Sequence, residues 1–193
     1  MTKIIGASGG YRQTLPFGLA CLIYHATATF CRRNCKAQGD PQGNTAAQMI
    51  GAARSARQYL AEDSARAGVS TEAELRLTDG AKASLEELAG DFEAFLTERG
   101  EVPWSESDHR AESFRELRLD PFKSSGDQRH EFGKHILAMR QRFAGWLENE
   151  DAVVAANAIL IAIDEADALI RQRLDRLATA FTIHPQAAAA VTA

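Results

Sequence analysis

Residues 44–96 read NTAAQMIGAARSARQYLAEDSARAGVSTEAELRLTDGAKASLEELAGDFEAFL, and this stretch decides the fold. Apolar residues recur in it at alternating steps of three and four, which gathers their side chains on one face of an α-helix. The turn-forming residues 67–70 interrupt the pattern, so we expect two long helices, 44–66 and 71–99. Their apolar faces are Ala46, Met49, Ala53, Ala56 and Leu60 on the first, and Ala81, Leu85, Leu88, Phe92 and Phe95 on the second.

The same helical period occurs on both sides of this stretch. Residues 14–36 and 151–181 each carry a long apolar stripe, and helices at 107–117 and 127–147 are expected between the stretch and the last of these. We predict an all-α fold, an up-and-down four-helix bundle with a helical insertion. The expected organisation is residues 1–100 as the first three bundle helices, 101–150 as the insertion, 151–181 as the fourth bundle helix and 182–193 as a flexible tail.

The last helix is apolar on a second side as well, through Val154, Ala158 and Ile161 in its first half. A helix that is apolar on two sides needs two packing partners. This pattern favours a subunit interface at that position.

The composition suits one sizeable core, because the chain has 193 residues and is 45% apolar. No run of about 18 apolar residues is present to span a bilayer, and the N-terminal stretch is too poor in apolar residues for a signal peptide. The three cysteines, Cys21, Cys31 and Cys35, are an odd number and lie close together, which favours reduced thiols. We therefore expect a cytoplasmic protein without a membrane partner.

Charge is unevenly distributed along the chain, whose net charge is −4. Residues 1–66 hold eight Lys and Arg against three acids, whereas the rest of the chain is acidic. Such asymmetry can create one basic face that binds phosphates by charge, although ordinary solubilising charge is an alternative reading. The candidate nucleic-acid-binding residues are Arg12, Arg32, Arg33, Lys36, Arg54, Arg57, Arg171, Arg173 and Arg176.

Residue types that support catalysis or metal binding are present in unsuitable patterns. His130 and His135 are five apart and diverge on a helix, so they do not form the zinc-protease pair of histidines four apart. Cys21, His25, Cys31 and Cys35 share an arc of one helix, but buried cysteines commonly fill a core. No nucleophile–base motif stands out. We expect no catalytic residue, no metal and no cofactor, so the protein is not expected to be an enzyme; a metal-dependent enzyme using the Cys/His arc is the weakest alternative.

Several short clusters resemble a known family. They are Gln48-Met49, Ala52-Ala53-Arg54-Ser55, Arg57-Gln58, Leu60-Ala61-Glu62, Glu74-Leu75, Leu77, Ala81, Ala83-Ser84-Leu85 and Glu87-Leu88. They resemble bacterial four-helix-bundle proteins, a group that includes proteins encoded in ribosomal RNA intervening sequences and the accessory variability determinant of diversity-generating retroelements. The clusters Gly9-Gly10-Tyr11-Arg12, Asp91-Phe92-Glu93-Ala94-Phe95-Leu96, Arg99-Gly100, Trp104, Ala156-Asn157-Ala158 and Gln172 are similar to the subgroup with a four-helix-bundle suffix domain.

The resemblance implies an up-and-down bundle that assembles into a ring-like homo-oligomer, a pentamer in the relatives. It also implies a non-catalytic accessory protein that binds structured RNA or DNA and a reverse-transcriptase partner. The alternative is a helical, homo-oligomeric protein-interaction scaffold that binds no nucleic acid.

Overall fold

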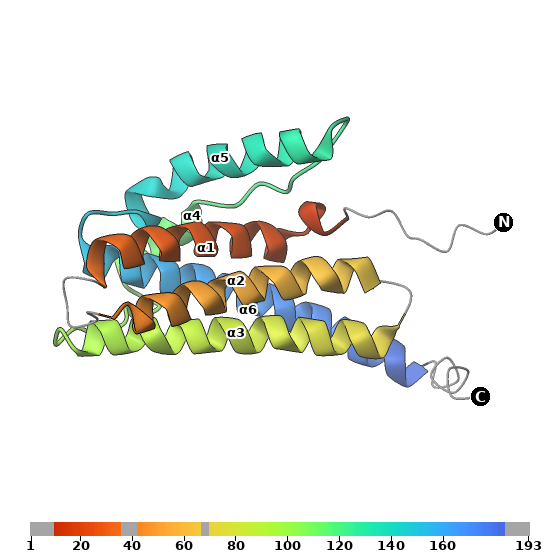
Figure 1. Ribbon diagram of the computed structural model, residues 1–193, viewed down its shortest axis with the longest axis horizontal. Helices are drawn as coiled ribbons and strands as arrows, with labels where there is room; N and C mark the ends of the chain where they lie inside the picture. The colour runs from red at the N-terminus through yellow and green to blue at the C-terminus, as the bar shows by residue number, and fades with distance from the viewer. Residues whose placement is uncertain (1–9, 36–41, 67–69, 184–193) are drawn as a thin grey trace.

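The computed structural model describes residues 10–35, 42–66 and 70–183, and all of the regular structure in these ranges is helical. The all-α prediction is therefore confirmed, with helix ends within about two residues of those expected. Lys36, a predicted nucleic-acid-binding residue, and the part of the expected tail from residue 184 onward lie outside the described residues. The elements are η1 (Gly10–Gln13), α1 (Leu15–Asn34), α2 (Asn44–Arg66), α3 (Thr71–Thr97), α4 (His109–Glu116), α5 (Gln128–Leu147) and α6 (Ala152–Ile183) (Figure 1).

Helices α3, α4 and α5 begin where a polar side chain accepts hydrogen bonds from the free amides of the first turn, whereas Thr14 at the start of α1 makes no such bond. Ser70 caps α3 by accepting a hydrogen bond from the Ala73 amide at 3.3 Å. Asp108 and Asp127 cap α4 and α5 in the same manner. α3 ends before Gly100, which adopts a φ of +74° that only glycine reaches without strain. Local sequence therefore accounts for the starts of α3, α4 and α5 and for the end of α3.

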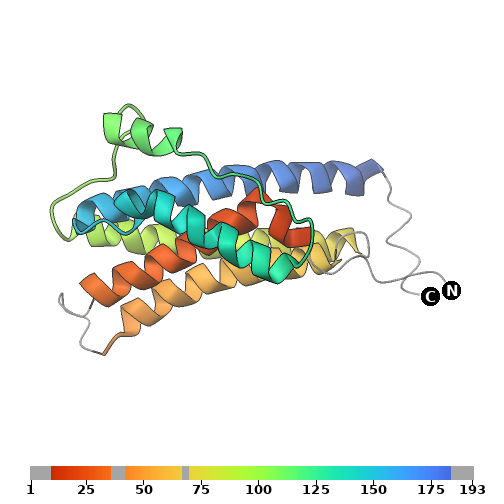
Figure 2. The same cartoon turned by 90° about the horizontal axis from the view of Figure 1, so that it is seen from above.

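The helices α1, α2, α3 and α6 lie side by side around a shared core (Figures 1 and 2). α1 packs against α2 and α6, and α3 packs against the same two helices. The predicted apolar faces of α2 and α3 form this core, except that Ala46 and Phe95 are only partly buried and that Leu96, next to Phe95, is fully buried. The largest fully buried side chains include Phe92, Leu22, Ile23, Met49, Leu85, Leu88, Ile159 and Ile170.

The inserted segment covers one side of this arrangement. α5 packs against α1 and α6, and α4 packs against α6. Aromatic contacts join the insertion internally, such as Phe114 against Phe143 with ring centroids 5.8 Å apart. Of the three residues expected at a subunit interface, Ala158 and Ile161 are 0% and 5% exposed within the single chain, and Val154 is partly buried. The chain itself therefore covers most of this second apolar side of α6, and Val154 keeps some exposed surface there.

Among the described residues, no helix is both long enough and apolar enough to cross a bilayer.

Candidate anion-binding site

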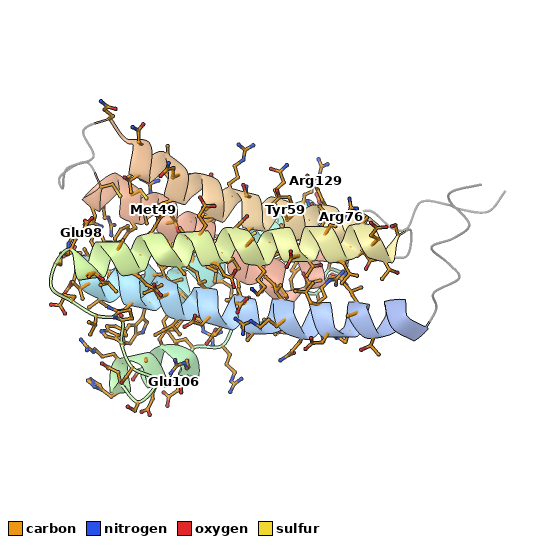
Figure 3. The ribbon with its side chains drawn as sticks, turned by 90° about the horizontal axis from the view of Figure 1, so that it is seen from below. Met49, Tyr59, Arg76, Glu98, Glu106 and Arg129 are labelled. Carbon is orange, nitrogen blue, oxygen red and sulfur yellow. The ribbon has the colours of Figure 1, made fainter. Side chains whose placement is uncertain are left out.

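The described parts of η1, α1 and most of α2 are free of carboxylates. Residues 10–35 and 42–61 contain no Asp or Glu, and their charged side chains are Arg12, Arg32, Arg33, Arg54 and Arg57. Acids dominate α3 and the middle of α6 instead (Figure 3, where α3 faces the viewer and Glu98 marks one of its ends). The folded chain therefore places a basic surface along α1 and α2, away from most of its acids.

A groove of about 480 Å³ opens on this basic side. Its walls come from η1, α1, α2 and α5, so residues far apart in sequence meet there. Three of its lining residues are arginines and none is Asp or Glu. The lining residues are Arg12, Phe17, Cys21, His25, Arg57, Phe132, Gly133, Ile136, Leu137 and Arg140. A cationic rim beside an apolar wall suits an anion that carries an apolar group.

Aromatic rings hold two of the arginines in place. The guanidinium carbon of Arg12 lies 4.5 Å from the centre of the Tyr11 ring and 5.9 Å from that of Phe132. That of Arg57 lies 4.3 Å from the centre of the Tyr24 ring. Such cation–π contacts fix a guanidinium without neutralising its charge. Both arginines can therefore still attract an anion.

Arg140 is fixed differently, by the carboxylate of Glu148. Its Nη2 and Nε donate to one Glu148 oxygen, Oε1, at 2.7 and 3.2 Å. The backbone carbonyl of Glu148 also accepts a hydrogen bond from Arg33 at 2.7 Å. Glu148 thus joins the end of α5 to the end of α1, and it leaves Arg140 the most neutralised of the three groove arginines.

His25 and Cys21 are polar residues of the groove that stay uncharged. Burial lowers the pKa of His25, and the nearby charges of Arg140, Arg57 and Arg32 lower it further against the opposing charge of Glu148. Burial raises the pKa of the Cys21 thiol to about 12, against the opposing charges of Arg57 and Arg12. At neutral pH the groove therefore offers a neutral imidazole and a protonated thiol. It is arranged to bind an anion and supplies no activated nucleophile.

Of the predicted nucleic-acid-binding residues that the structure describes, only Arg12 and Arg57 line the groove. Arg54 is exposed on α2, three residues before Arg57 and so on the same side of the helix. Arg32 and Arg33 are exposed near the end of α1, where Arg32 donates to the Thr29 hydroxyl at 2.9 Å. We use the name α1–α2 face for the surface of η1, α1 and α2 that carries these five arginines.

The three predicted arginines of α6 do not line this groove. Arg171 pairs with Asp167 at 2.7 Å, and Arg176 donates to the Gln172 carbonyl at 3.1 Å. Arg173 lies 2.7 Å from the Asp63 carboxylate, which is buried. The charge of Arg173 is thus engaged in joining helices.

Sequence reasoning missed Arg140 and the role of His25. The available signal was the spacing of Gly133, Ile136, Leu137 and Arg140, which places these residues on one side of α5. What the spacing could not reveal is that this side of α5 meets α1, more than a hundred residues earlier in the chain.

The three cysteines and His135 pack against neighbouring side chains. Cys21, Cys31 and Cys35 are buried, and the Cys31 sulfur lies 3.8 Å from the Met49 sulfur in the core. His135 stacks near Phe122, with ring centroids 5.5 Å apart. Across the part of the chain that the structure describes, no group of three or more His, Cys, Asp or Glu is placed to hold a metal ion.

A second hollow of about 460 Å³ lies where α2 and α3 approach their connection. Glu62, Glu72 and Arg76 are among its lining residues, and Arg76 already pairs with Glu72 at 2.6 Å. The remaining charge is negative and the hollow has few apolar residues. The groove on the α1–α2 face is therefore the stronger candidate for a site.

Comparisons with known proteins return no family model, no curated protein and no solved structure that matches the chain. Its function has to be inferred from the residues and geometry described above.

Proposed function

We propose that this chain is a non-catalytic accessory protein that binds structured RNA or DNA through its α1–α2 face. The observation that carries the proposal is the separation of charge, because five arginines and no carboxylate occupy residues 10–35 and 42–61. Contacts of this kind engage phosphates by charge and position a nucleic acid without reading its sequence. The acidic side would face away from the phosphates.

Two further parts of the proposal rest on the family resemblance alone. One is an up-and-down four-helix bundle that assembles into a ring-like homo-oligomer, a pentamer in the relatives. The packing of α1, α2, α3 and α6 around one core is compatible with the bundle. The other part is a reverse-transcriptase partner, as in diversity-generating retroelements. A ring would repeat the α1–α2 face and so multiply the phosphates that are engaged at once.

The proposal is tested by titrating the purified protein with a structured RNA and a duplex DNA over a range of salt, with particle mass measured in the same buffer. The logarithm of affinity should fall about linearly with the logarithm of salt concentration, and the slope counts the phosphates neutralised. Changing Arg54→Glu and Arg57→Glu together should weaken binding strongly. The matched control is Arg171→Glu with Arg176→Glu, which changes the net charge equally on α6.

Each outcome has a distinct meaning. Selective loss in the Arg54/Arg57 variant supports the α1–α2 face. Equal loss in both variants means that net charge governs binding, and unchanged affinity at low salt removes Arg54 and Arg57 from the interface. A monomeric mass at working concentration contradicts the ring.

The alternative function is a protein-interaction scaffold without nucleic-acid binding. The acids of α3 and α6 favour it, because burial raises the pKa values of Asp91, Asp164 and Glu165. Neighbouring carboxylates, Glu87 beside Asp91 and Asp167 and Glu93 beside Asp164, raise these pKa values further, whereas the charge of Arg115 opposes the rise at Asp164 and Glu165. A basic protein partner would relieve this repulsion. The scaffold function would be supported if the protein bound neither the structured RNA nor the duplex DNA at low salt.

A further inference from the structure

We infer that the groove between α1 and α5 binds one nucleotide of a single-stranded segment, with its phosphate near Arg57 and Arg12 and its base against the apolar wall of α5. The inference deepens the proposed function and rests on it, because it assigns to one point of the α1–α2 face a defined ligand. The groove has the size, the positive charge and the apolar wall that such a ligand requires.

The size of the groove suits a single nucleotide. Its volume of about 480 Å³ falls within the range of roughly 300–1,000 Å³ that is common for small-molecule sites. A duplex is too wide to enter a hollow of this size and would lie across its rim. The groove therefore selects for a nucleotide that is not held inside a double helix.

The wall of the groove supplies the apolar contact that a base requires. Phe132 is partly buried, and Leu137 is 55% exposed although its neighbour Ile136 is buried. A duplex keeps its bases stacked inside, whereas a single strand can place a base on an aromatic or aliphatic surface. Covering Phe132 and Leu137 with a base removes apolar surface from water, which phosphate alone cannot do.

The charges of the groove match a phosphate. Arg12 and Arg57 are held on the rings of Tyr11 and Tyr24, so little conformational freedom is lost when they bind an anion. No carboxylate lines the groove to compete with the ligand, and Glu148 is committed to Arg140 and Arg33. Guanidinium groups form strong paired hydrogen bonds with phosphate oxygens.

His25 reports on occupancy of the groove. The charged groups that face it are Arg32 on its own helix, Arg57 on α2, and Arg140 and Glu148 at the end of α5. Burial, and after it the net positive charge around the ring, disfavours the imidazolium. A bound phosphate adds negative charge nearby, so the pKa of His25 should rise when the groove is filled.

The experiment compares adenosine monophosphate, inorganic phosphate, adenosine and octyl phosphate as probes of the full chain. Affinity is measured by calorimetry, and the His25 ring is followed by NMR over pH, with its signal assigned by His25→Gln. We expect adenosine monophosphate to bind at least about tenfold more tightly than each of the other three, because only it satisfies both the arginines and the wall with a flat base. Only bound phosphates should raise the pKa of His25.

Two variants test whether the ligand binds in the groove. Arg57→Gln should weaken adenosine monophosphate binding about tenfold by removing one charged contact. Gly133→Phe should abolish binding by filling the groove, because a Cβ added at Gly133 meets no atom within 4 Å and the ring has open space to occupy. Gly145→Phe is the matched control, since Gly145 lies on the same helix, has equally open surroundings and does not line the groove.

The outcomes separate this inference from the proposed function. Salt-dependent binding of structured RNA together with no response to adenosine monophosphate overturns the nucleotide site and leaves the proposed function standing. Nucleotide binding by a protein that binds neither RNA nor DNA overturns both the proposed function and the assignment of a single-stranded segment to the groove. If inorganic phosphate or octyl phosphate binds as tightly as adenosine monophosphate, the contact between the base and the apolar wall is overturned. If the Gly133→Phe and Gly145→Phe variants lose the same affinity for adenosine monophosphate, the placement of the ligand in the groove is overturned.

Discussion

Arg173 and Asp63 form an ion pair that joins α6 to α2, with Nη2 of Arg173 lying 2.7 Å from Oδ2 of Asp63. The Asp63 side chain is 3% exposed. Glu74 on α3 lies 3.7 Å from the same nitrogen and is also buried. Burial raises the pKa of Asp63, and the charge of Arg173 and its hydrogen bond oppose that rise. The guanidinium of Arg173 on α6 thus pairs with carboxylates of both α2 and α3.

Replacing Arg173 should destabilise the fold severely. Arg173→Met leaves Asp63 and Glu74 buried without their cation, which should lower the free energy of unfolding by about 3 kcal/mol or more. The measurement is urea unfolding followed by circular dichroism. Arg76→Met is the control, because the Arg76–Glu72 pair is exposed and should contribute less than about 1 kcal/mol. Similar losses in the two variants would show that the Arg173 pair is no stronger than a surface pair.

The protein should become less stable in acid, because Asp108, which caps α4, loses its negative charge there. Hydrogen bonds from the Arg110 side chain and amide lower the pKa of Asp108 from its ordinary 3.8 to about 2. Since the folded state favours the ionised carboxylate, the stability that Asp108 contributes is complete above pH 3.8 and is lost as pH falls toward 2.

This contribution is measured by NMR titration of the Asp108 carboxyl and by melting temperature against pH. Asp108→Asn keeps a capping oxygen but cannot ionise. The melting temperature of the wild-type protein should therefore fall further over this acid range than that of the Asp108→Asn variant. Parallel melting curves for the two proteins would show that Asp108 has no such coupling.

The helices could be predicted because their signals are local. The stripe through Leu85, Leu88 and Phe92 requires only the helical period, and the caps at Ser70 and Asp127 require only neighbouring residues. The second apolar side of α6 shows the limit of such signals. The apolar side chains of Ala158 and Ile161 predict that another surface covers them. The sequence does not show whether that surface belongs to a second subunit or to the same chain.

The site was harder to predict than the fold, because its residues come together only through tertiary packing. Arg12 and Arg57 could be selected by charge, whereas Arg140 joins them because α5 lies along α1. Arg173 has the same charge and a plausible position near a helix C-terminus. Its partner Asp63 is 110 residues away in the chain, and no spacing rule connects the two.

The groove thiol should resist alkylation in the folded protein. Cys21 is 4% exposed, and its pKa of about 12 leaves only on the order of one thiol in ten thousand ionised at pH 8. Iodoacetamide should therefore label Cys21 slowly in native buffer and completely in urea, as read by peptide mass spectrometry. Fast native labelling of Cys21 at pH 8 would show that the thiol is far more accessible or more acidic than its surroundings indicate.

Asn157 should hold the inserted segment against α6. Its side-chain oxygen accepts the Trp104 amide at 2.7 Å, its nitrogen donates to the Val153 carbonyl at 2.9 Å, and it is 1% exposed. Asn157→Leu removes the acceptor and leaves the Trp104 amide unpaired, which should cost about 1–3 kcal/mol of unfolding free energy.

Tryptophan fluorescence can tell where this loss occurs, because both tryptophans of the chain, Trp104 and Trp146, lie in the insertion with ring centroids 6.2 Å apart. In the Asn157→Leu variant, emission should shift to the red at lower urea than the loss of helical circular dichroism. Thr179→Ala is the control, since that hydroxyl bonds only to the Asp175 carbonyl one turn earlier on α6 and is exposed. If both signals of the Asn157→Leu variant change at the same urea concentration, the insertion and the four long helices unfold as one unit, and Asn157 stabilises the whole molecule instead of one attachment.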